Sequence, residues 1–303
     1  MALRALIPFE VGLELLGELP QDVDVAVWDG ASPRSTGDPV DLWVPPWTLA
    51  DFPAAFADLP GLRVVQTLTA GYDHVLAHRP AGVVVCSAQG VHDGPAAEWV
   101  IAAILGALRR LPAHLRAQDA GAPRRLTSDS LIGKTVTLLG YGGIGKAVEA
   151  RLLGFEPARI VRVASRAREG IHGPAELAEL AAQTDVLVIA AALNEHTEGL
   201  VGAEVLARLP DGALIVNVSR GPLVDQDALL AELSGGRLLA ALDVASPDPL
   251  PDEHPLLRAP GLIYTPHVAG GTRLALPSVF AFIGEQIGRL ASDEPLANVV
   301  AGP

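Results

Sequence analysis

The sequence predicts an α/β protein of two domains, each a doubly wound parallel sheet covered by helices. Short apolar runs alternate with amphipathic segments from end to end, which is typical of strand–helix–strand units. The 303 residues are 50% hydrophobic and only 19% charged, so a chain of this length can bury the cores of two ordinary domains. Residues 112–130 show little periodicity and are expected to form a surface connection.

Apolar runs of strand length place the elements of both sheets. In the N-terminal third they predict strands at residues 2–7, 23–28, 42–44, 62–67 and 83–87. A long helix is predicted over 95–110, where apolar residues recur at helical spacing. Six further strands are predicted at 135–139, 159–164, 186–190, 213–218, 239–244 and 262–265. The amphipathic stretch 272–290 is expected to pack back on the first domain.

Composition excludes several classes of function. A formal net charge of −13 argues against a nucleic-acid or anionic-membrane surface, and an aromatic content of 4% disfavours a base-stacking platform. The single cysteine, Cys86, cannot form an internal disulfide, and no Cys/His cluster has zinc spacing. With no leader peptide or membrane span apparent, we expect a cytoplasmic protein without a metal site.

The segment TVTLLGYGGIGKAVEARLLG predicts a dinucleotide-binding loop between a strand and a helix. Gly140, Gly142 and Gly145 fit G-x-G-x-x-G, in which the glycines permit a tight turn, backbone approach to a pyrophosphate and close helix–strand packing. The helix N-terminus, with Gly143 and Ile144, offers free N–H groups to the phosphates. A glycine-rich turn can also be a plain connection, but the strand–loop–helix setting favours the cofactor loop.

The end of the next predicted strand favours NADP over NAD. An NAD site usually has an acidic residue about 20 residues beyond the loop, where it holds the ribose hydroxyls. Here the strand reads RIVRVASRAREG, with Ser165 near that place and Arg166 and Arg168 following it. A guanidinium can bind a 2′-phosphate through two hydrogen bonds. The arginines could also be ordinary solvated charges, so NAD remains the alternative cofactor.

Three polar residues lie just past the C-terminal ends of predicted strands in the second half of the chain. Arg220 follows ALIVNVS, Asp248 lies shortly beyond ALDV, and His267 follows LIYTP. Ligands of open α/β sheets bind at this carboxyl edge. Each residue alone has a structural explanation, as a surface charge, a turn former or a loop histidine. Together they predict an active site.

Three segments resemble the D-isomer-specific 2-hydroxyacid dehydrogenase family, in its glyoxylate/hydroxypyruvate reductase-like form. They are LLGYGGIGKAV, LARLPDGALIVNVSRGPLVDQDALLAEL and LLAALDVASPDPLPDEHPLLRAPGLIYTPHVAGGT. The resemblance implies a Rossmann cofactor domain, 95–268, inserted into a flavodoxin-like substrate-binding domain, 1–94 and 269–303. It also implies a homodimer that pairs through the cofactor domains.

The resemblance implies reduction of a small 2-keto acid, such as glyoxylate or hydroxypyruvate, to a D-2-hydroxy acid with NADPH or NADH. Arg220 would bind the carboxylate and carbonyl of the substrate, and His267 would donate a proton. Asp248 would orient the imidazole and stabilise its charged form. The family usually has Glu at this position, so the carboxylate here has a shorter stem. If Asp248 only forms a turn, Asp252 or Glu253 could support the histidine instead.

Further site residues follow from the same resemblance. In TLTAGYDHV, the N–H groups of Ala70 and Gly71 would bind the substrate carboxylate, although a plain strand-ending turn is the alternative. Tyr72 and Trp47 are candidates for the pocket wall, and single aromatics are also common in cores and rims. The remaining cofactor contacts that the resemblance implies are Thr197, Ser219 and Asp243.

Relatives with other functions share this architecture. Formate dehydrogenases have a Gln–His pair, which Asp248 argues against, and the regulatory domain often attached to phosphoglycerate dehydrogenases is not expected here. Corepressor-like relatives are cofactor-gated binding proteins that can keep the same three polar residues. Turnover of a keto acid distinguishes an enzyme from such a binding protein.

Overall fold

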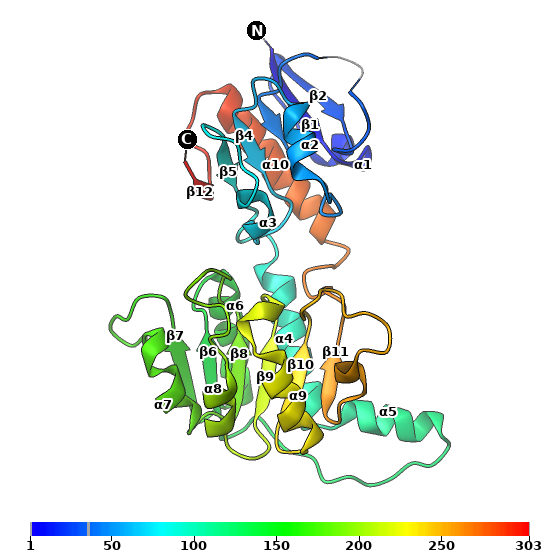
Figure 1. Cartoon of the computed structure of the whole chain (residues 1–303), viewed down its shortest axis with the longest axis vertical. Coiled ribbons are helices and arrows are strands. Elements are labelled where there is room, and N and C mark those ends of the chain that lie inside the picture. Colours follow the sequence, from blue (N-terminus) through cyan, green and yellow to red (C-terminus); the bar gives the residue numbers. More distant parts are fainter. Residues whose placement is uncertain (1, 35–36, 303) are drawn as a thin grey trace. The chain divides into compact units, whose positions relative to one another are not determined.

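The computed structural model describes residues 2–34 and 37–302, in two compact units (Figure 1). The first unit comprises residues 1–92 and 273–303, and the second comprises 93–272. The second unit is therefore inserted between the two halves of the first. Each unit is a six-stranded sheet with helices on both faces, which confirms the predicted fold class.

The sheet of the first unit has the order β2-β1-β3-β4-β5-β12. Its strands are β1 (Leu3–Ile7), β2 (Val23–Val27), β3 (Leu42–Trp43), β4 (Val64–Gln66), β5 (Val84–Cys86) and β12 (Val299–Ala301). The first five are parallel and follow the flavodoxin-like order. The short edge strand β12 pairs antiparallel with β5 and was not predicted from the sequence.

Four helices cover this sheet: α1 (Val11–Leu15), α2 (Phe52–Ala57), α3 (Asp73–Leu76) and α10 (Ala275–Ala291). Phe280 and Ile283 of α10 are fully buried against one face together with α1, which confirms that the C-terminal helix packs on the first unit. Phe52 of α2 and Val75 of α3 pack with Trp43 on the opposite face. Both faces of the sheet are therefore buried, as uninterrupted apolar strands require.

The sheet of the second unit is wholly parallel, in the order β7-β6-β8-β9-β10-β11. Its strands are β6 (Thr135–Leu139), β7 (Arg159–Val163), β8 (Val186–Ile189), β9 (Leu214–Asn217), β10 (Leu239–Leu242) and β11 (Leu262–Tyr264). All six predicted strands are confirmed, to within two residues at each end. The strand order reverses between β6 and β8, and such a switch point is where doubly wound sheets bind ligands.

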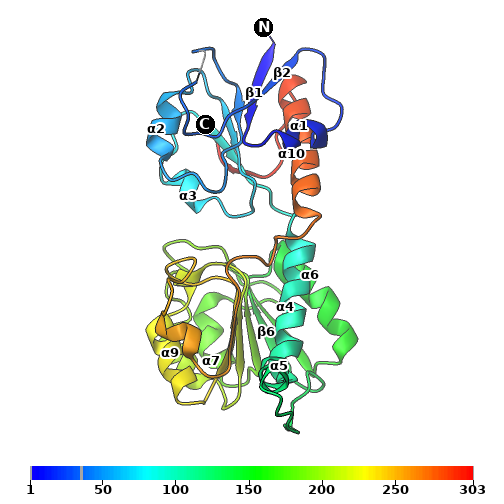
Figure 2. The same ribbon diagram turned by 90° about the vertical axis from the view of Figure 1, so that its right-hand side faces the viewer.

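Helices α4 (Asp93–Leu108) and α6 (Gly143–Leu152) pack on one face of this sheet, and α7 (Leu177–Ala181), α8 (Ala203–Arg208) and α9 (Gln226–Ser234) on the other (Figure 2). Short 3₁₀ turns lie at η1 (Leu153–Phe155), η2 (Pro174–Glu176), η3 (Gly221–Leu223) and η4 (Pro255–Arg258).

The predicted surface connection 112–130 was wrong in its first half, because α5 (Leu111–Asp119) is helical. No residue of α5 is buried, and its two leucines, Leu111 and Leu115, are exposed. Among the described residues, no helix has the length and hydropathy needed to cross a bilayer.

An ion pair joins α6 to β7 beside the glycine loop. Arg162 Nε donates to Glu149 Oε2 at 2.9 Å and Nη2 donates to Oε1, while the guanidinium lies 5.5 Å from the ring centroid of Tyr141. These hydrogen bonds from Arg162 hold the pKa of Glu149 below its usual value, against the effect of burial. The pair therefore stabilises the folded second unit when the carboxyl is ionised.

We expect Glu149→Gln to lower the free energy of unfolding of the second unit by about 2 kcal/mol at neutral pH, because it removes a charged hydrogen-bond pair. The expected loss of free energy is small for a broken ion pair because the Arg162 side chain is 33% exposed, so solvent screens the interaction. Since the folded-state pKa is lowered, the stabilisation is present above the unfolded value and is lost as pH falls through the folded value. Urea unfolding at neutral pH and at successively lower pH, until the difference between parent and variant stops changing, measures this, with the exposed Glu179→Gln as control. A loss that is equal at all pH values would contradict the assignment.

Candidate active site

The glycine-rich loop joins β6 to α6 at the switch point of the second unit. Gly140 has φ of +101° and donates its N–H to the Val163 carbonyl at 2.8 Å. A Cβ at Gly140 would collide with the backbone of Ala190, and one at Gly145 would collide with the Gly140 carbonyl oxygen. No atom lies within 4 Å of the Cβ position of Gly142. The first and third glycines are thus required by packing, and the second leaves open the approach that a pyrophosphate needs.

The N-terminus of α6 faces this opening. Gly142 is the N-cap residue and has no side chain to cap the helix, so the N–H groups of Gly143, Ile144 and Gly145 have no partner within the helix. The carboxylate of Asp93, the first residue of α4, lies against Gly143, where a Cβ would collide with it. The open glycine and the exposed helix end fit a dinucleotide phosphate. Sequence reasoning did not single out Asp93.

A turn after β7 carries the residues predicted to select the cofactor. Ala164 donates its N–H to the His172 carbonyl at 3.0 Å, which returns the chain beside the strand. Ser165, Arg166 and Arg168 are exposed on this turn, and Arg168 Nη1 donates to the Arg166 carbonyl at 3.2 Å. Two guanidinium groups therefore follow β7 where an NAD site would have an acidic residue.

Arg220 lies three residues after β9, in a loop that contacts the loop after β10 at the carboxyl edge of the sheet. Its carbonyl accepts from Asn217 Nδ2 at 2.9 Å, and its Nη1 donates to the Ser219 carbonyl at 2.9 Å. A Cβ at the following Gly221 would collide with the Ala245 carbonyl. The loop after β9 and the loop after β10 are thus in direct contact.

Asp248 and His267 meet at this edge. Nδ1 of His267 lies 2.7 Å from Oδ2 of Asp248, with the two side chains 50% and 25% exposed. The shorter aspartate stem does reach the imidazole. Glu253, the alternative support for the histidine, instead lies 3.8 Å from Arg258. His267 itself has φ of +56°, a left-handed conformation that non-glycine residues rarely adopt.

Asp243, predicted as a cofactor contact, anchors the histidine loop. Its carboxylate is buried, and Oδ1 accepts from Thr265 Oγ1 at 2.6 Å and from the Val268 N–H at 2.9 Å. Its Oδ2 accepts from the Ala269 N–H at 2.9 Å, and its carbonyl accepts from the His267 N–H at 2.7 Å. These bonds hold the chain on both sides of His267. The sequence offers only the position of Asp243 at the end of a strand as a signal for this role.

The two other predicted cofactor contacts are engaged locally. Thr197 Oγ1 donates to the Ala192 carbonyl at 2.7 Å and accepts from the Asn194 N–H at 2.8 Å. The hydroxyl of Ser219 donates to the Ala191 carbonyl, which joins the ends of β8 and β9. Both residues therefore shape the loops of the carboxyl edge.

In the first unit, the carbonyl groups of the loop after β4 are hydrogen-bonded to side chains. The carbonyls of Thr67, Leu68, Thr69 and Gly71 each accept a hydrogen bond from a side chain. The donors are the side chains of Gln66, His92, Thr67 and Thr69, respectively. Because a carbonyl oxygen can only accept, the Nε2 of His92, 2.9 Å from the Leu68 oxygen, carries the proton.

The same loop leaves N–H groups available. In the part of the chain that the structure describes, the N–H groups of Ala70 and Gly71 donate to no backbone or side-chain acceptor. Adjacent unpaired N–H groups form a site for an anion. Tyr72 follows as the half-buried N-cap residue of α3. Trp47 is 55% exposed, with its ring centroid 5.2 Å from that of Phe9.

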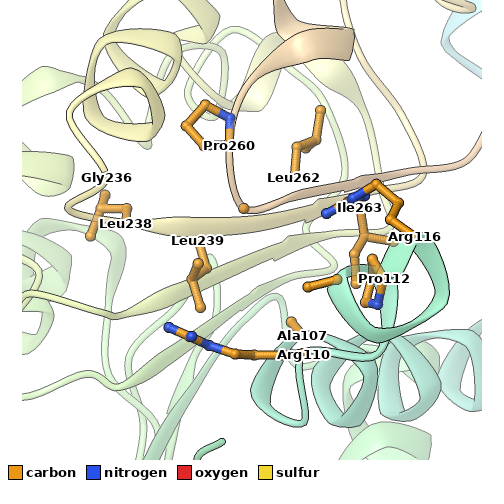
Figure 3. Close-up of a pocket in the computed structure, with 12 residues that line it drawn as sticks. Ala107, Arg110, Pro112, Arg116, Gly236, Leu238, Leu239, Pro260, Leu262 and Ile263 are labelled. Carbon is orange, nitrogen blue, oxygen red and sulfur yellow. The ribbon is translucent and has the colours of Figure 1, made fainter. Parts of the chain in front are cut away.

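A pocket of about 290 Å³ lies elsewhere in the second unit, where β10 and β11 begin (Figure 3). Leu239 and Ile263 line it together with Arg110, the N-cap residue of α5, and Arg116, in the last turn of that helix. It is at the opposite end of the strands from Arg220. Among the described residues, no three potential metal ligands come together anywhere.

Residues 101–269, more than half of the chain, match the family model described as "D-isomer specific 2-hydroxyacid dehydrogenase, NAD binding domain". The chain belongs to this family. The matched residues lie inside the second unit, which is the family's NAD-binding Rossmann domain. The resemblance found in the sequence is confirmed.

Relatives of this dehydrogenase are known in sequence and in structure. Glyoxylate reductase/hydroxypyruvate reductase of Homo sapiens is 34% identical over 224 residues, which cover 70% of this chain and 68% of the relative. A D-isomer specific 2-hydroxyacid dehydrogenase of Xanthobacter autotrophicus, solved with NADPH and MES, is 29% identical, with a TM-score of 0.84 over 99% of this chain and 98% of the other. An NADPH-dependent glyoxylate/hydroxypyruvate reductase of Sinorhizobium meliloti, solved with NADP and malonate, is 26% identical, with a TM-score of 0.83 over 99% and 97%.

Proposed function

We propose that this dehydrogenase reduces glyoxylate, hydroxypyruvate or a similarly small 2-keto acid to the D-2-hydroxy acid, with NADPH preferred over NADH. The observation that carries the proposal is the 2.7 Å contact between His267 and Asp248, at the same sheet edge as Arg220. The relatives named above support the substrate class and the cofactor.

Each of the three side chains has one task. The guanidinium of Arg220 binds the substrate carboxylate and carbonyl through its planar fork and stabilises the negative charge that develops on the carbonyl oxygen. His267 turns Nδ1 to Asp248, so Nε2 is the atom that delivers the proton to that oxygen. Asp248 holds the ring in this orientation. When bound, the nicotinamide supplies the hydride that the carbonyl carbon receives.

We assign cofactor binding to the second unit, which also carries Arg220 and His267, and we assign further substrate-binding groups to the first unit. The N–H groups of Ala70 and Gly71 are the donors for the substrate carboxylate, and Tyr72 and Trp47 are the candidates for the pocket wall. Thr197, Ser219 and Asp243 shape the nicotinamide end of the cofactor site. A cytoplasmic location, expected from the composition, stays a prediction.

A panel of keto acids tests the function. Glyoxylate and hydroxypyruvate should be reduced, and NADPH oxidised. Formate and 3-phosphoglycerate, offered with oxidised NADP or NAD, should be oxidised only slowly. Binding of NADPH without turnover of any keto acid would contradict the proposal and favour a corepressor-like protein.

The preference for NADPH predicts an effect of Arg166. Arg166→Ala should lower kcat/KM with NADPH at least about tenfold, since one charged hydrogen bond contributes roughly 1.5–3 kcal/mol. The value with NADH should change less than twofold. Kinetics with both cofactors measure this, and Arg208→Ala, an exposed arginine on α8, is the control. Equal losses with both cofactors, or NADH preference in the parent, would contradict the proposal.

We also propose that the protein is a homodimer that pairs through the second unit. Leu111 and Leu115 of α5 are 51% and 59% exposed, on a helix with no buried residue, and a second copy would cover them. Leu115→Glu should convert dimer to monomer in sedimentation equilibrium, because burial of each leucine contributes about 1.5–3 kcal/mol. Leu153→Glu, 65% exposed elsewhere on the unit, is the matched control. A monomeric parent, or a dimeric Leu115→Glu variant, would exclude this interface.

A further inference from the structure

We infer that Gln226 is a positioning residue of the proposed reaction, because it fixes the backbone of the loop that carries Asp248. The inference rests on the proposed function, in which Asp248 orients His267. Gln226 is not one of the three side chains to which the proposed reaction assigns a chemical role. It acts on Asp248 only through the backbone of residues 245–250.

Gln226 is clamped to a single residue of that loop. Its Nε2 donates to the Ser246 carbonyl at 2.8 Å, and its Oε1 accepts from the Ser246 N–H at 3.0 Å. The side-chain amide thus pairs with both backbone groups of one residue, as a neighbouring strand would. Gln226 is itself held as the first residue of α9, whose N-cap Asp225 accepts from the Ala228 N–H at 3.0 Å.

A second anchor holds the other side of Asp248. The N–H of Leu250 donates to the hydroxyl of Tyr264 at 3.0 Å, and the Leu250 side chain is buried. Tyr264 is the last residue of β11, which leads directly to His267. The loop is therefore tied to α9 at Ser246 and to β11 at Leu250, with Asp248 midway between the two anchors.

The short stem of Asp248 makes this position critical. In the described residues, the His267 ring is the only side-chain partner of the Asp248 carboxylate. Residues 246–249 are all exposed, so no core packing sets their position. A hydrogen bond of 2.7 Å is lost by a displacement of about 1 Å. An aspartate is shorter than a glutamate by one C–C bond of roughly 1.5 Å, and cannot recover that displacement by changing rotamer.

Gln226→Glu tests the clamp with almost no change in shape. The new carboxylate cannot donate to the Ser246 carbonyl and instead repels it. We expect kcat for keto-acid reduction to fall about tenfold, while the KM for the keto acid, the Kd of NADPH measured by fluorescence and the Tm stay near the parent values. Gln183→Glu, at an exposed glutamine of the same unit, adds the same charge and should have no effect.

A double-mutant cycle separates positioning from general damage. If Gln226 acts through Asp248, Gln226→Glu should cause no further loss of kcat in an Asp248→Asn background. Tyr264→Phe, which removes only the second anchor, should behave in the same way with a smaller loss. Losses that multiply in the double variants, or an unchanged kcat in Gln226→Glu, would overturn the inference.

A readout without turnover keeps this inference distinct from the proposed function. The Nδ1 proton of His267, bonded to a carboxylate, should give a downfield ¹H NMR signal, identified by its loss in His267→Gln and in Asp248→Asn. The signal should weaken or move in Gln226→Glu and stay in Gln183→Glu. If the parent reduces no keto acid, the proposed function fails but this result still tests the clamp. An unchanged signal in Gln226→Glu would overturn the inference regardless of activity.

Discussion

Replacing Arg220 by lysine should lower kcat/KM for the keto acid by roughly 100- to 1000-fold. Lysine keeps the charge but loses the planar fork that binds a carboxylate and a carbonyl at once. The loss of such paired, charge-assisted hydrogen bonds is worth about 3–4 kcal/mol in the transition state, and each 1.4 kcal/mol is a factor of ten. Steady-state kinetics over a range of keto-acid concentrations measure the effect.

The same variant must leave cofactor binding intact if Arg220 acts on the substrate. The Kd of NADPH should change less than twofold, and Arg208→Lys, on the exposed surface of α8, should change neither quantity. Near-normal turnover by Arg220→Lys would remove Arg220 from the mechanism. A large loss of NADPH affinity would instead assign it to the cofactor site.

Replacing His267 by glutamine should lower kcat by roughly 10²- to 10⁴-fold, the usual contribution of a positioned general acid. Asp248→Asn should lower kcat less, because the histidine remains but its orientation is less well fixed. Asp248→Glu should retain most of the activity, since it keeps the carboxylate. Rates measured at saturating NADPH and keto acid give these effects directly.

The pair should also behave as one unit. Once His267 is absent, Asp248→Asn should cause little further loss, because the carboxylate acts only through the imidazole. Thermal unfolding of the variants should remain near that of the parent, since both side chains are partly exposed. Full independent losses in the double variant would contradict the Asp–His pair.

The sequence determined the strands and the cofactor loop. A central parallel strand that is buried on both faces is an apolar run, such as LIV in β9 or VLVI in β8, and all eleven predicted strands are present. The glycine loop was equally clear, because Gly140 and Gly145 each lie where a side chain would collide with backbone. Arg220, Asp248 and His267 were predicted because all three lie just past strand ends at one edge of the sheet, where doubly wound sheets bind ligands.

Two elements that bury little apolar surface, α5 and β12, were not predicted from the sequence. Helix α5 has no buried residue and is only nine residues long, so its two leucines, Leu111 and Leu115, are too few to reveal a helical period in the sequence. The strand β12 is three residues long and only partly buried, and it exists because it pairs with β5, far away in the chain. Pairing of that kind is a property of the folded sheet.

Only the tertiary structure decided how the candidate site is held together. Asp248 is 19 residues from His267, and the distance between them depends on how the loops after β10 and β11 fold. The buried carboxylate of Asp243 and the amide of Gln226 act on backbone groups about 20 or more residues away. A backbone group carries no signature of its side-chain partner in the sequence. The sequence therefore identified the candidate residues for the proposed chemistry, and the packing of neighbouring loops determined what positions them.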